Sequence, residues 1–322
     1  MPNDIRVPSN IMDARTTEWL ATLKNDGEKR GYFKPLGPDH YAVFTATTTT
    51  LLVTFETFDS IQNDTKNEMP LGFDLVSEND WSHLGIIANG NTWFRDDKVF
   101  DYFDRLTDDG FFDKFDQIVF AGSGMCGYAA AAFSVAAPGS TVLAFNPQAT
   151  LDPNVTEWDH RFQKMRRTSF TGRYGYAPDM VEAADRVFVF YDPEDEMDAM
   201  HASLFTAPHI TKLRCRHLGQ HIMNDMIHMG ILQLLVDVAG SSGDVAKRFR
   251  RAFRARHRYT PYLRRLLMRL DDDDRMVLAG LLCRNVVNRI SAPRFQRRLN
   301  AIESNLAASG RLLPALASSQ LK

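Results

Sequence analysis

The segment 117–145 limits the possible folds of this chain more than any other. An apolar stretch, 117–121, is followed at once by a glycine-rich turn, Gly122–Gly127, and then by an alanine-rich helical stretch that stops at Pro138-Gly139. A second apolar stretch occupies residues 141–145. A strand, a helix and a strand in this order form the crossover that two parallel neighbouring strands require. The segment therefore predicts an α/β fold built on a parallel sheet.

The rest of the first 240 residues continues this alternation. Apolar residues recur at helical spacing over 97–110, and a further helix is predicted over 224–238. Apolar stretches of strand length lie at 51–55, 83–88, 186–191 and 210–218. Strands that alternate with helices in this way predict a doubly wound, mostly parallel sheet.

The tetrapeptide Gly240-Ser241-Ser242-Gly243 is typical of a break between domains. We therefore expect an α/β domain over residues 1–240 and a helical extension over residues 241–322. The extension is basic, because residues 244–298 contain sixteen Lys or Arg and five Asp, although the net charge of the 322 residues is −2. Such a block favours an anionic partner bound through 244–298; the alternatives are a solvated face or docking on the acidic part of the chain. Nucleic acid is not the expected partner, since no nucleic-acid-binding motif accompanies the charge.

Other features bear on location and cofactors. No stretch approaches eighteen consecutive apolar residues, and the first residues lack the pattern of a signal peptide. Cys126, Cys215 and Cys283 are too few and too scattered for a disulfide framework or a zinc site. We expect a cytoplasmic protein with reduced thiols, no transmembrane segment, no cofactor and no metal. Its oligomeric state stays open.

A glycine-flanked turn between a strand and a helix is a place where hydrolases carry a nucleophile. The nucleophile has a strained backbone there, and only small residues fit two positions before and after it. It also lies at the start of a helix, where free N–H groups and the helix dipole stabilise a negatively charged oxygen. The turn Gly122–Gly127 lies in this context.

Three motifs follow the order of nucleophile, acid and histidine in the α/β-hydrolase family, which the chain resembles over residues 41–240. They are GSGMCGYAA at 122–130, YDPEDEMD at 191–198 and LGQH at 218–221. The resemblance implies a fold of the α/β-hydrolase type. It also implies that His221 is the general base and that Asp195, or else Asp192, orients its imidazole. The resemblance further implies an oxyanion hole formed by the backbone N–H of Met125 and a backbone N–H near Thr57.

The elbow departs from the family pattern at the nucleophile itself. Alignment with small residues at Gly122 and Cys126 puts Gly124 in the nucleophile position, and glycine has no side chain that attacks a carbonyl. Moving the nucleophile to Ser123 places the bulky Met125 where a small residue is needed. Moving it to Cys126 places a tyrosine there. The alignment that fits best therefore has no nucleophile.

Three routes to catalysis stay open. Ser123 could reach the site because the turn is flexible, His221 could activate water directly, or Cys126 could act as a thiolate at the helix start. The first functional hypothesis is therefore an esterase or acyltransferase with His221 as its base. Its substrate would be a small molecule or of polysaccharide type, and the sequence does not identify it.

Two other hypotheses stay open. The substituted elbow and the basic extension favour a non-catalytic binding or assembly protein. In addition, Gly122, Gly124 and Gly127 have the spacing of a dinucleotide-binding fingerprint. An acidic residue for the ribose is expected about twenty residues further on, but residues 144–147 contain no Asp or Glu.

Overall fold

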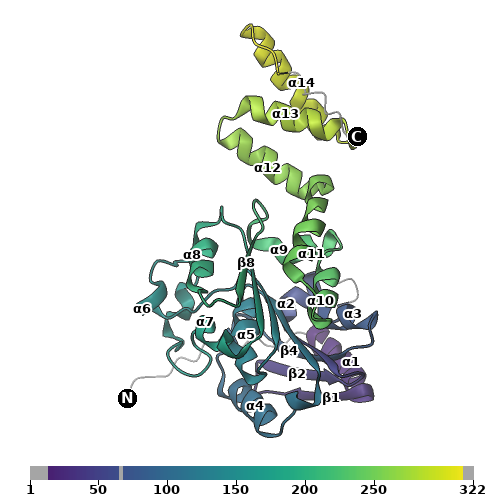
Figure 1. Cartoon of the computed structure of the whole chain (residues 1–322), viewed down its shortest axis with the longest axis vertical. Helices are drawn as coiled ribbons and strands as arrows, with labels where there is room; N and C mark the ends of the chain where they lie inside the picture. Colours follow the sequence, from purple (N-terminus) through teal and green to yellow (C-terminus); the bar gives the residue numbers. More distant parts are fainter. Residues whose placement is uncertain (1–13, 65–67, 315–322) are drawn as a thin grey trace. The chain divides into compact units, whose positions relative to one another are not determined.

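The structure is a computed structural model that describes residues 14–64 and 68–314. Within these residues one eight-stranded sheet runs in the order β1-β2-β4-β3-β5-β6-β7-β8 (Figure 1). The strands are β1 Gly31–Pro35, β2 His40–Thr45, β3 Thr50–Thr57, β4 Ser82–Ala88, β5 Gln117–Ser123, β6 Thr141–Phe145, β7 Arg186–Tyr191 and β8 Ile210–Arg214. The β1–β2 and β2–β4 pairs are antiparallel, and all other pairs are parallel. This confirms the predicted doubly wound, mostly parallel sheet of the α/β-hydrolase type.

Helices connect the strands and cover both faces of the sheet (Figure 1). They are α1 Ala14–Arg30, α2 Phe58–Asp64, α3 Leu71–Ser77, α4 Asp97–Asp108, α5 Met125–Phe133, α6 Pro153–Thr156, α7 Ala177–Met180, α8 Glu196–Leu204, α9 Ile222–His228, α10 Leu232–Gly240 and α11 Val245–Ala252. Successive residues of β2 show the two faces, since Ala42 belongs to the core on the α4 and α5 side, while Tyr41 and Val43 pack with Trp19 of α1. Because both faces are covered, the central strands are buried and mostly apolar.

The core on the α4 and α5 side is rich in aromatic rings. Phe55, Phe103 and Phe133 stack on one another with ring centroids 4.6–5.9 Å apart, so one residue each of β3, α4 and α5 meet there. Helix α5, the helix predicted to follow the glycine-rich turn, is buried along almost its whole length. The position of the turn is therefore determined by packing on both of its sides.

The predicted helix over 224–238 consists of two helices. Helix α9 ends at His228, α10 begins at Leu232, and Gly230 between them has a φ of 66°. A glycine in this left-handed conformation ends a helix, because residues with a Cβ rarely adopt it. Among the described residues no single helix is long and apolar enough to span a membrane, and only the bent pair Gly219–His228 and Leu232–Gly240 has that length and composition.

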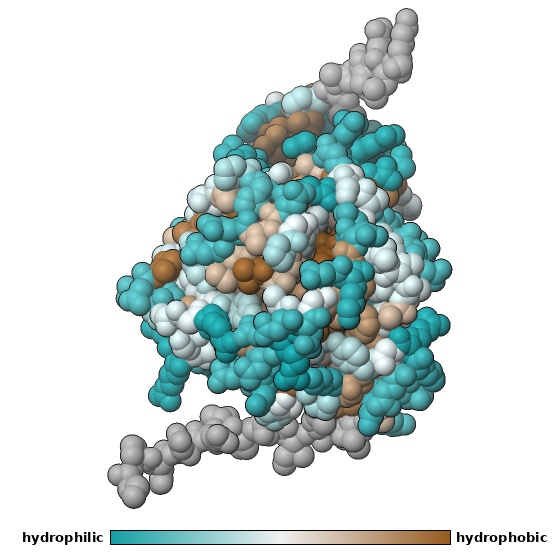
Figure 2. All heavy atoms as spheres, turned by 60° about the horizontal axis from the view of Figure 1, so that its bottom comes forward, coloured by the Kyte–Doolittle hydropathy of each residue, from teal (hydrophilic) through white to brown (hydrophobic). Residues whose placement is uncertain are grey.

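The chain divides into two compact units, of which the first ends at Arg251 and the second begins at Ala252. The second contains a short 3-10 helix, η6 Phe253–Arg258, and three α-helices, α12 Thr260–Asp272, α13 Met276–Val287 and α14 Pro293–Ala308. Cys283 of α13 and Ile302 of α14 are fully buried in this unit. Figure 2 shows one face of the molecule, on which hydrophilic residues predominate and apolar residues form small separate patches.

Candidate functional site

The turn between β5 and α5 has an unusual backbone at one residue. Gly124 follows the last residue of β5 and has a φ of 57° and a ψ of −124°. Its N–H donates to the carbonyl oxygen of Phe145 at 2.8 Å, and its own carbonyl accepts from the N–H of Tyr128 at 2.9 Å. The turn is thus fixed to β6 on one side and to α5 on the other. Gly124, which the sequence alignment puts in the nucleophile position, has a backbone conformation of the kind expected in such turns.

The glycines of the turn differ in what a side chain would meet. A Cβ at Gly122 would lie 2.2 Å from the carbonyl oxygen of Cys126, and one at Gly127 would lie 2.8 Å from that of Phe145. A Cβ at Gly124 would have no atom within 4 Å. Packing therefore requires glycine at Gly122 and Gly127, whereas only the backbone conformation favours it at Gly124.

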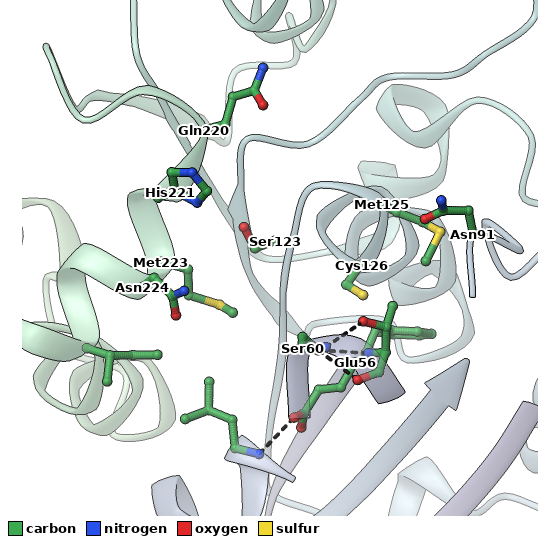
Figure 3. A pocket seen from close by; sticks show the side chains of 14 residues that line it. Glu56, Ser60, Asn91, Ser123, Met125, Cys126, Gln220, His221, Met223 and Asn224 are labelled. Atoms are coloured by element: carbon green, nitrogen blue, oxygen red, sulfur yellow. Dashed lines mark hydrogen bonds between the residues drawn. The ribbon is translucent and has the colours of Figure 1, made fainter. Parts of the chain in front are cut away.

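A pocket of about 240 Å³ opens beside this turn. Figure 3 shows Ser123 and His221 near each other on one side of it, with Cys126 and Glu56 further along its wall. The pocket is lined by Phe55, Glu56, Thr57, Ser60, Leu71, Asn91, Ser123, Met125, Cys126, Gln220, His221, Met223, Asn224 and Ile227. The structure thus brings together Ser123, His221 and the two residues of the expected oxyanion hole. It does not bring Asp192 or Asp195 into the pocket lining.

His221 is exposed at the end of a short 3-10 helix, η5 Gly219–His221. Within residues 14–64 and 68–314 its imidazole has no hydrogen bond or ion pair. Asp192 is buried and contacts the backbone of the same loop: one carboxylate oxygen accepts from the N–H of Gly219 at 2.8 Å. The other accepts from the N–H of Glu194 at 3.0 Å. Asp192 therefore holds the histidine loop rather than the imidazole.

Asp195 is likewise engaged elsewhere. Its carboxylate caps α8 by accepting from the N–H of Asp198 at 3.1 Å, and it lies 3.9 Å from Arg161 Nη1. An N-cap contact of this kind satisfies one of the free N–H groups at a helix start. Neither of the two predicted acids orients His221 in this structure.

A second side chain holds Gly219 from the opposite direction. The Asn146 amide donates to the Gly219 carbonyl at 3.3 Å and to the Asp198 carboxylate at 2.6 Å. Asn146 directly follows β6 and has a φ of 46°, a left-handed conformation that asparagine tolerates better than most residues. It also lies in the part of the chain where a dinucleotide site would carry its acid, but its buried amide binds protein groups instead.

The Asn146 contact is the end of a buried polar network. Arg161 donates to Asp198 at 2.7 Å and to Asp159 at 2.8 Å, and Asp159 also contacts His201 Nε2 at 2.9 Å. Burial alone would raise the pKa of Asp159, but hydrogen bonds from His201 and Arg161 hold this pKa well below its usual range. The network connects the segment after β6, helix α8 and the histidine loop.

The two residues of the expected oxyanion hole differ in availability. The N–H of Thr57 donates to Ser60 Oγ at 3.0 Å, and the Thr57 hydroxyl accepts from the N–H of Ser60 at 3.1 Å. Met125 is the first residue of α5, and the first N–H groups of a helix have no acceptor within the helix. The Met125 N–H is therefore the better placed of the two for a ligand oxygen.

Glu56 is a pocket residue that the sequence reasoning missed. It lies in β3, is buried, and accepts hydrogen bonds from the N–H groups of Leu71 at 2.7 Å and Gly72 at 3.2 Å. The Thr54 hydroxyl donates to it at 2.9 Å and contacts His83 Nε2 at 2.8 Å. Burial raises the pKa of Glu56, and these donors oppose that effect. An acidic residue inside an otherwise apolar strand is the signal that could have found it.

Cys126 is buried beside Glu56, and this environment bears on the thiolate hypothesis. Burial, together with the negative charge of Glu56, raises the pKa of the Cys126 thiol well above its ordinary value. A thiol in such surroundings stays protonated at neutral pH and is a poor nucleophile.

We therefore expect Cys126 to react with iodoacetamide at pH 8 at least about tenfold more slowly in the folded protein than in urea. The measurement is time-resolved alkylation followed by peptide mapping. Equal rates in the two conditions would show that the thiol is accessible and ionised, contrary to its buried position.

The contact between Asp192 and Gly219 gives a second expectation. Asp192→Asn replaces one of the two accepting oxygens by an NH2 group, which cannot accept, so we expect a loss of about 2 kcal/mol in the free energy of unfolding. Hydrogen exchange in the histidine loop should also become faster. Asp195→Asn is the matched control, because asparagine caps a helix about as well as aspartate. Urea unfolding measures the stability of the two variants, and exchange mass spectrometry measures hydrogen exchange in their histidine loops. Unchanged exchange in Asp192→Asn would contradict the assigned contact.

The similarity of this chain to known proteins lies in solved structures. No protein-family model matches it, and no curated protein sequence matches it. Solved structures with a similar fold include the esterase domain of a Rhodothermus marinus protein (12% identity, TM-score 0.40, 62% of this chain and 90% of that one). They also include an esterase of the archaeon Pyrobaculum calidifontis (12%, 0.40, 72% and 94%). A third is the capsule O-acetyltransferase of Neisseria meningitidis serogroup A (10%, 0.38, 63% and 94%). Similarities of this size carry no conclusion about the reaction or the ligand of this chain.

Across the described residues, no group of three or more His, Cys, Asp or Glu side chains is placed to hold a metal ion. The groups at the pocket that can bind a ligand or react include Ser123, His221, Glu56 and the start of α5.

Proposed function

We propose that the pocket at the elbow binds a small acyl compound, an ester or the corresponding carboxylate, without forming an acyl-enzyme at position 124. The observation that carries the proposal is Gly124 itself. Its φ of 57° and ψ of −124° suit a nucleophile turn and its surroundings are open, yet it has no side chain that could attack. Acyl-enzyme chemistry at this position needs a group that the chain does not supply.

The surroundings of His221 support binding over turnover. A histidine base needs an acid that fixes its tautomer and stabilises its charged form, and loss of that acid in a serine protease lowers kcat about 10⁴-fold. Here Asp192 and Asp195 are engaged by backbone N–H groups. The imidazole remains available as a hydrogen-bonding group for a bound oxygen or nitrogen.

The pocket has the composition of a small-molecule site. Apolar side chains form part of its wall, and a small number of polar groups lie at its edges, as in most ligand pockets. The apolar members include Phe55, Leu71, Met125, Met223 and Ile227. Its volume of about 240 Å³ suits a molecule the size of a short fatty acid. The Met125 N–H at the start of α5 is suited to a carbonyl or carboxylate oxygen of this ligand.

Saturation-transfer NMR with hexanoate and methyl hexanoate tests this proposal. We expect transfer from the natural chain and its loss in Met223→Trp, which fills the pocket. His228→Trp lies on the same helix but outside the pocket lining, and it should leave the transfer unchanged. Absence of transfer to both probes, or equal transfer in Met223→Trp, would refute the proposal.

A second candidate function is hydrolysis through Ser123, because its side chain lies in the same pocket as His221 (Figure 3). A fluorophosphonate probe followed by peptide mapping distinguishes the two candidates. The binding proposal expects no adduct on the natural chain. An adduct on Ser123 that disappears in His221→Ala would establish the second candidate instead.

A further inference from the structure

The arginines of the helical unit that begins at Ala252 include two contrasting groups. Members of the first group pair with carboxylates of the same unit: Arg269 with Asp273 at 3.9 Å, Arg284 with Glu303 at 3.5 Å and Arg298 with Asp271 at 2.8 Å. Members of the second group, Arg254, Arg256 and Arg289, form no ion pair with any carboxylate of the residues that the structure describes. The unit therefore neutralises some of its arginines and leaves others, these three among them, without a carboxylate partner among the described residues.

Two arginines of the second group are held in place by uncharged groups. The Arg256 guanidinium lies 4.4 Å from the ring centroid of Phe253 and donates to the Phe253 carbonyl at 2.8 Å. Arg289 donates to the carbonyls of His257 at 2.9 Å and Asn285 at 3.2 Å. These contacts restrict both side chains and use only part of the five N–H donors of each guanidinium.

The charges of the three arginines converge on one residue. His257 lies in η6 with Arg254 and Arg256, and its backbone carbonyl accepts from Arg289. Burial lowers the pKa of His257, and the positive charges of Arg256, Arg289 and Arg254 lower it further. Positive charges that all act on one residue also repel one another, so an anion among them would relieve the repulsion.

We propose that Arg254, Arg256 and Arg289 bind a phosphate group. Three cations match a doubly charged oxyanion, and the planar guanidinium fork is suited to two parallel hydrogen bonds with phosphate oxygens. Arg254, His257 and Arg289 are exposed, so a ligand reaches the cluster from solvent. A free phosphorylated compound and a lipid headgroup share this chemistry, and the experiment separates them. The inference does not depend on the function of the elbow pocket.

Isothermal titration of the full chain with inorganic pyrophosphate, at low ionic strength where exposed charges are least screened, tests the site. We expect Arg254→Gln and Arg289→Gln each to weaken binding about tenfold. Arg254→Gln removes an exposed side chain without a hydrogen bond, so the fold should be unaffected. Arg294→Gln is the matched control: it is the same charge change at another exposed arginine, which does not act on His257.

Co-sedimentation with phosphatidylcholine vesicles, with and without phosphatidic acid, identifies the source of the phosphate. Pyrophosphate binding that depends on Arg254 and Arg289 supports the site and a free ligand. Arg254-dependent binding to the phosphatidic acid vesicles alone supports the site and a lipid ligand. Absence of binding to both, or an equal loss in Arg294→Gln, would overturn the proposal.

Discussion

The Gly124→Ser variant is expected to gain reactivity toward a fluorophosphonate probe that leaves the natural chain unlabelled. The hydroxyl would project from a backbone with φ 57° and ψ −124° into space that has no atom within 4 Å of the Cβ. Its chain neighbours Ser123 and Met125 both line the pocket that also contains His221. A backbone in this sparsely populated region costs a residue with a Cβ about 1–3 kcal/mol, which a folded domain of this size tolerates.

The reactivity that Gly124→Ser gains should be limited to activated substrates. Because no acid orients His221, we expect slow release of p-nitrophenol from an activated ester and no detectable hydrolysis of amides. The measurements are intact-protein mass spectrometry, peptide mapping and ester hydrolysis. Gly139→Ser is the matched control, since Gly139 also has a positive φ, 81°, and an open Cβ position, but neither Gly139 nor its chain neighbours line the pocket. A folded Gly124→Ser protein without an adduct at position 124 would contradict the assignment of this position as the nucleophile slot.

Gly122→Ala should have the largest effect on stability of any single methyl addition at the elbow. The new Cβ would lie 2.2 Å from the Cys126 carbonyl oxygen and 3.0 Å from the Gly127 nitrogen, both of them backbone atoms of α5. That helix is buried, so it cannot move away without disturbing the core. Overpacking typically costs 1–3 kcal/mol, and a clash with backbone lies at the upper end, so we expect a loss of about 3 kcal/mol.

Urea unfolding of Gly122→Ala and Gly124→Ala measures this difference. Both variants add one methyl group to the same turn, but at Gly124 the methyl group meets no atom and only the backbone conformation resists it. The expected loss there is about 1 kcal/mol. Equal losses in the two variants would show that α5 can shift, and that packing does not determine the turn.

Much of the sheet could be predicted because its strands are apolar on both faces. The stretches 117–121, 141–145 and 186–191 are continuous in the sequence and are buried strands in the structure. Strand β1 could not be predicted in the same way, since it is a half-exposed edge strand that begins with Gly31 and ends with Pro35. The helix break at Gly230 was also missed, because a glycine inside a helical pattern does not reveal its φ.

The sequence was enough to predict which segments form the candidate site, but it was not enough to predict the hydrogen bonds of their side chains. The motifs predicted a site with His221 that Ser123 could reach, and both side chains line one pocket in the structure. The partner of Asp192 depends on how the loop before His221 folds, and a hydrogen bond of 2.8 Å is lost by a shift of about one ångström. The hydrogen bonds of Glu56 depend in the same way on where α3 begins, because its carboxylate oxygens accept from the first N–H groups of that helix.

The different reasons for the glycines at the elbow also have an evolutionary consequence. Gly122 and Gly127 are required by atoms of the helix and the neighbouring strand, so the turn persists whether or not a reaction takes place there. Gly124 has no such constraint, and a single base change converts two of the glycine codons into serine codons. On this fold, a pocket that only binds its ligand and a pocket that forms an acyl-enzyme can therefore differ by a single substitution, Gly124→Ser, which the fold permits.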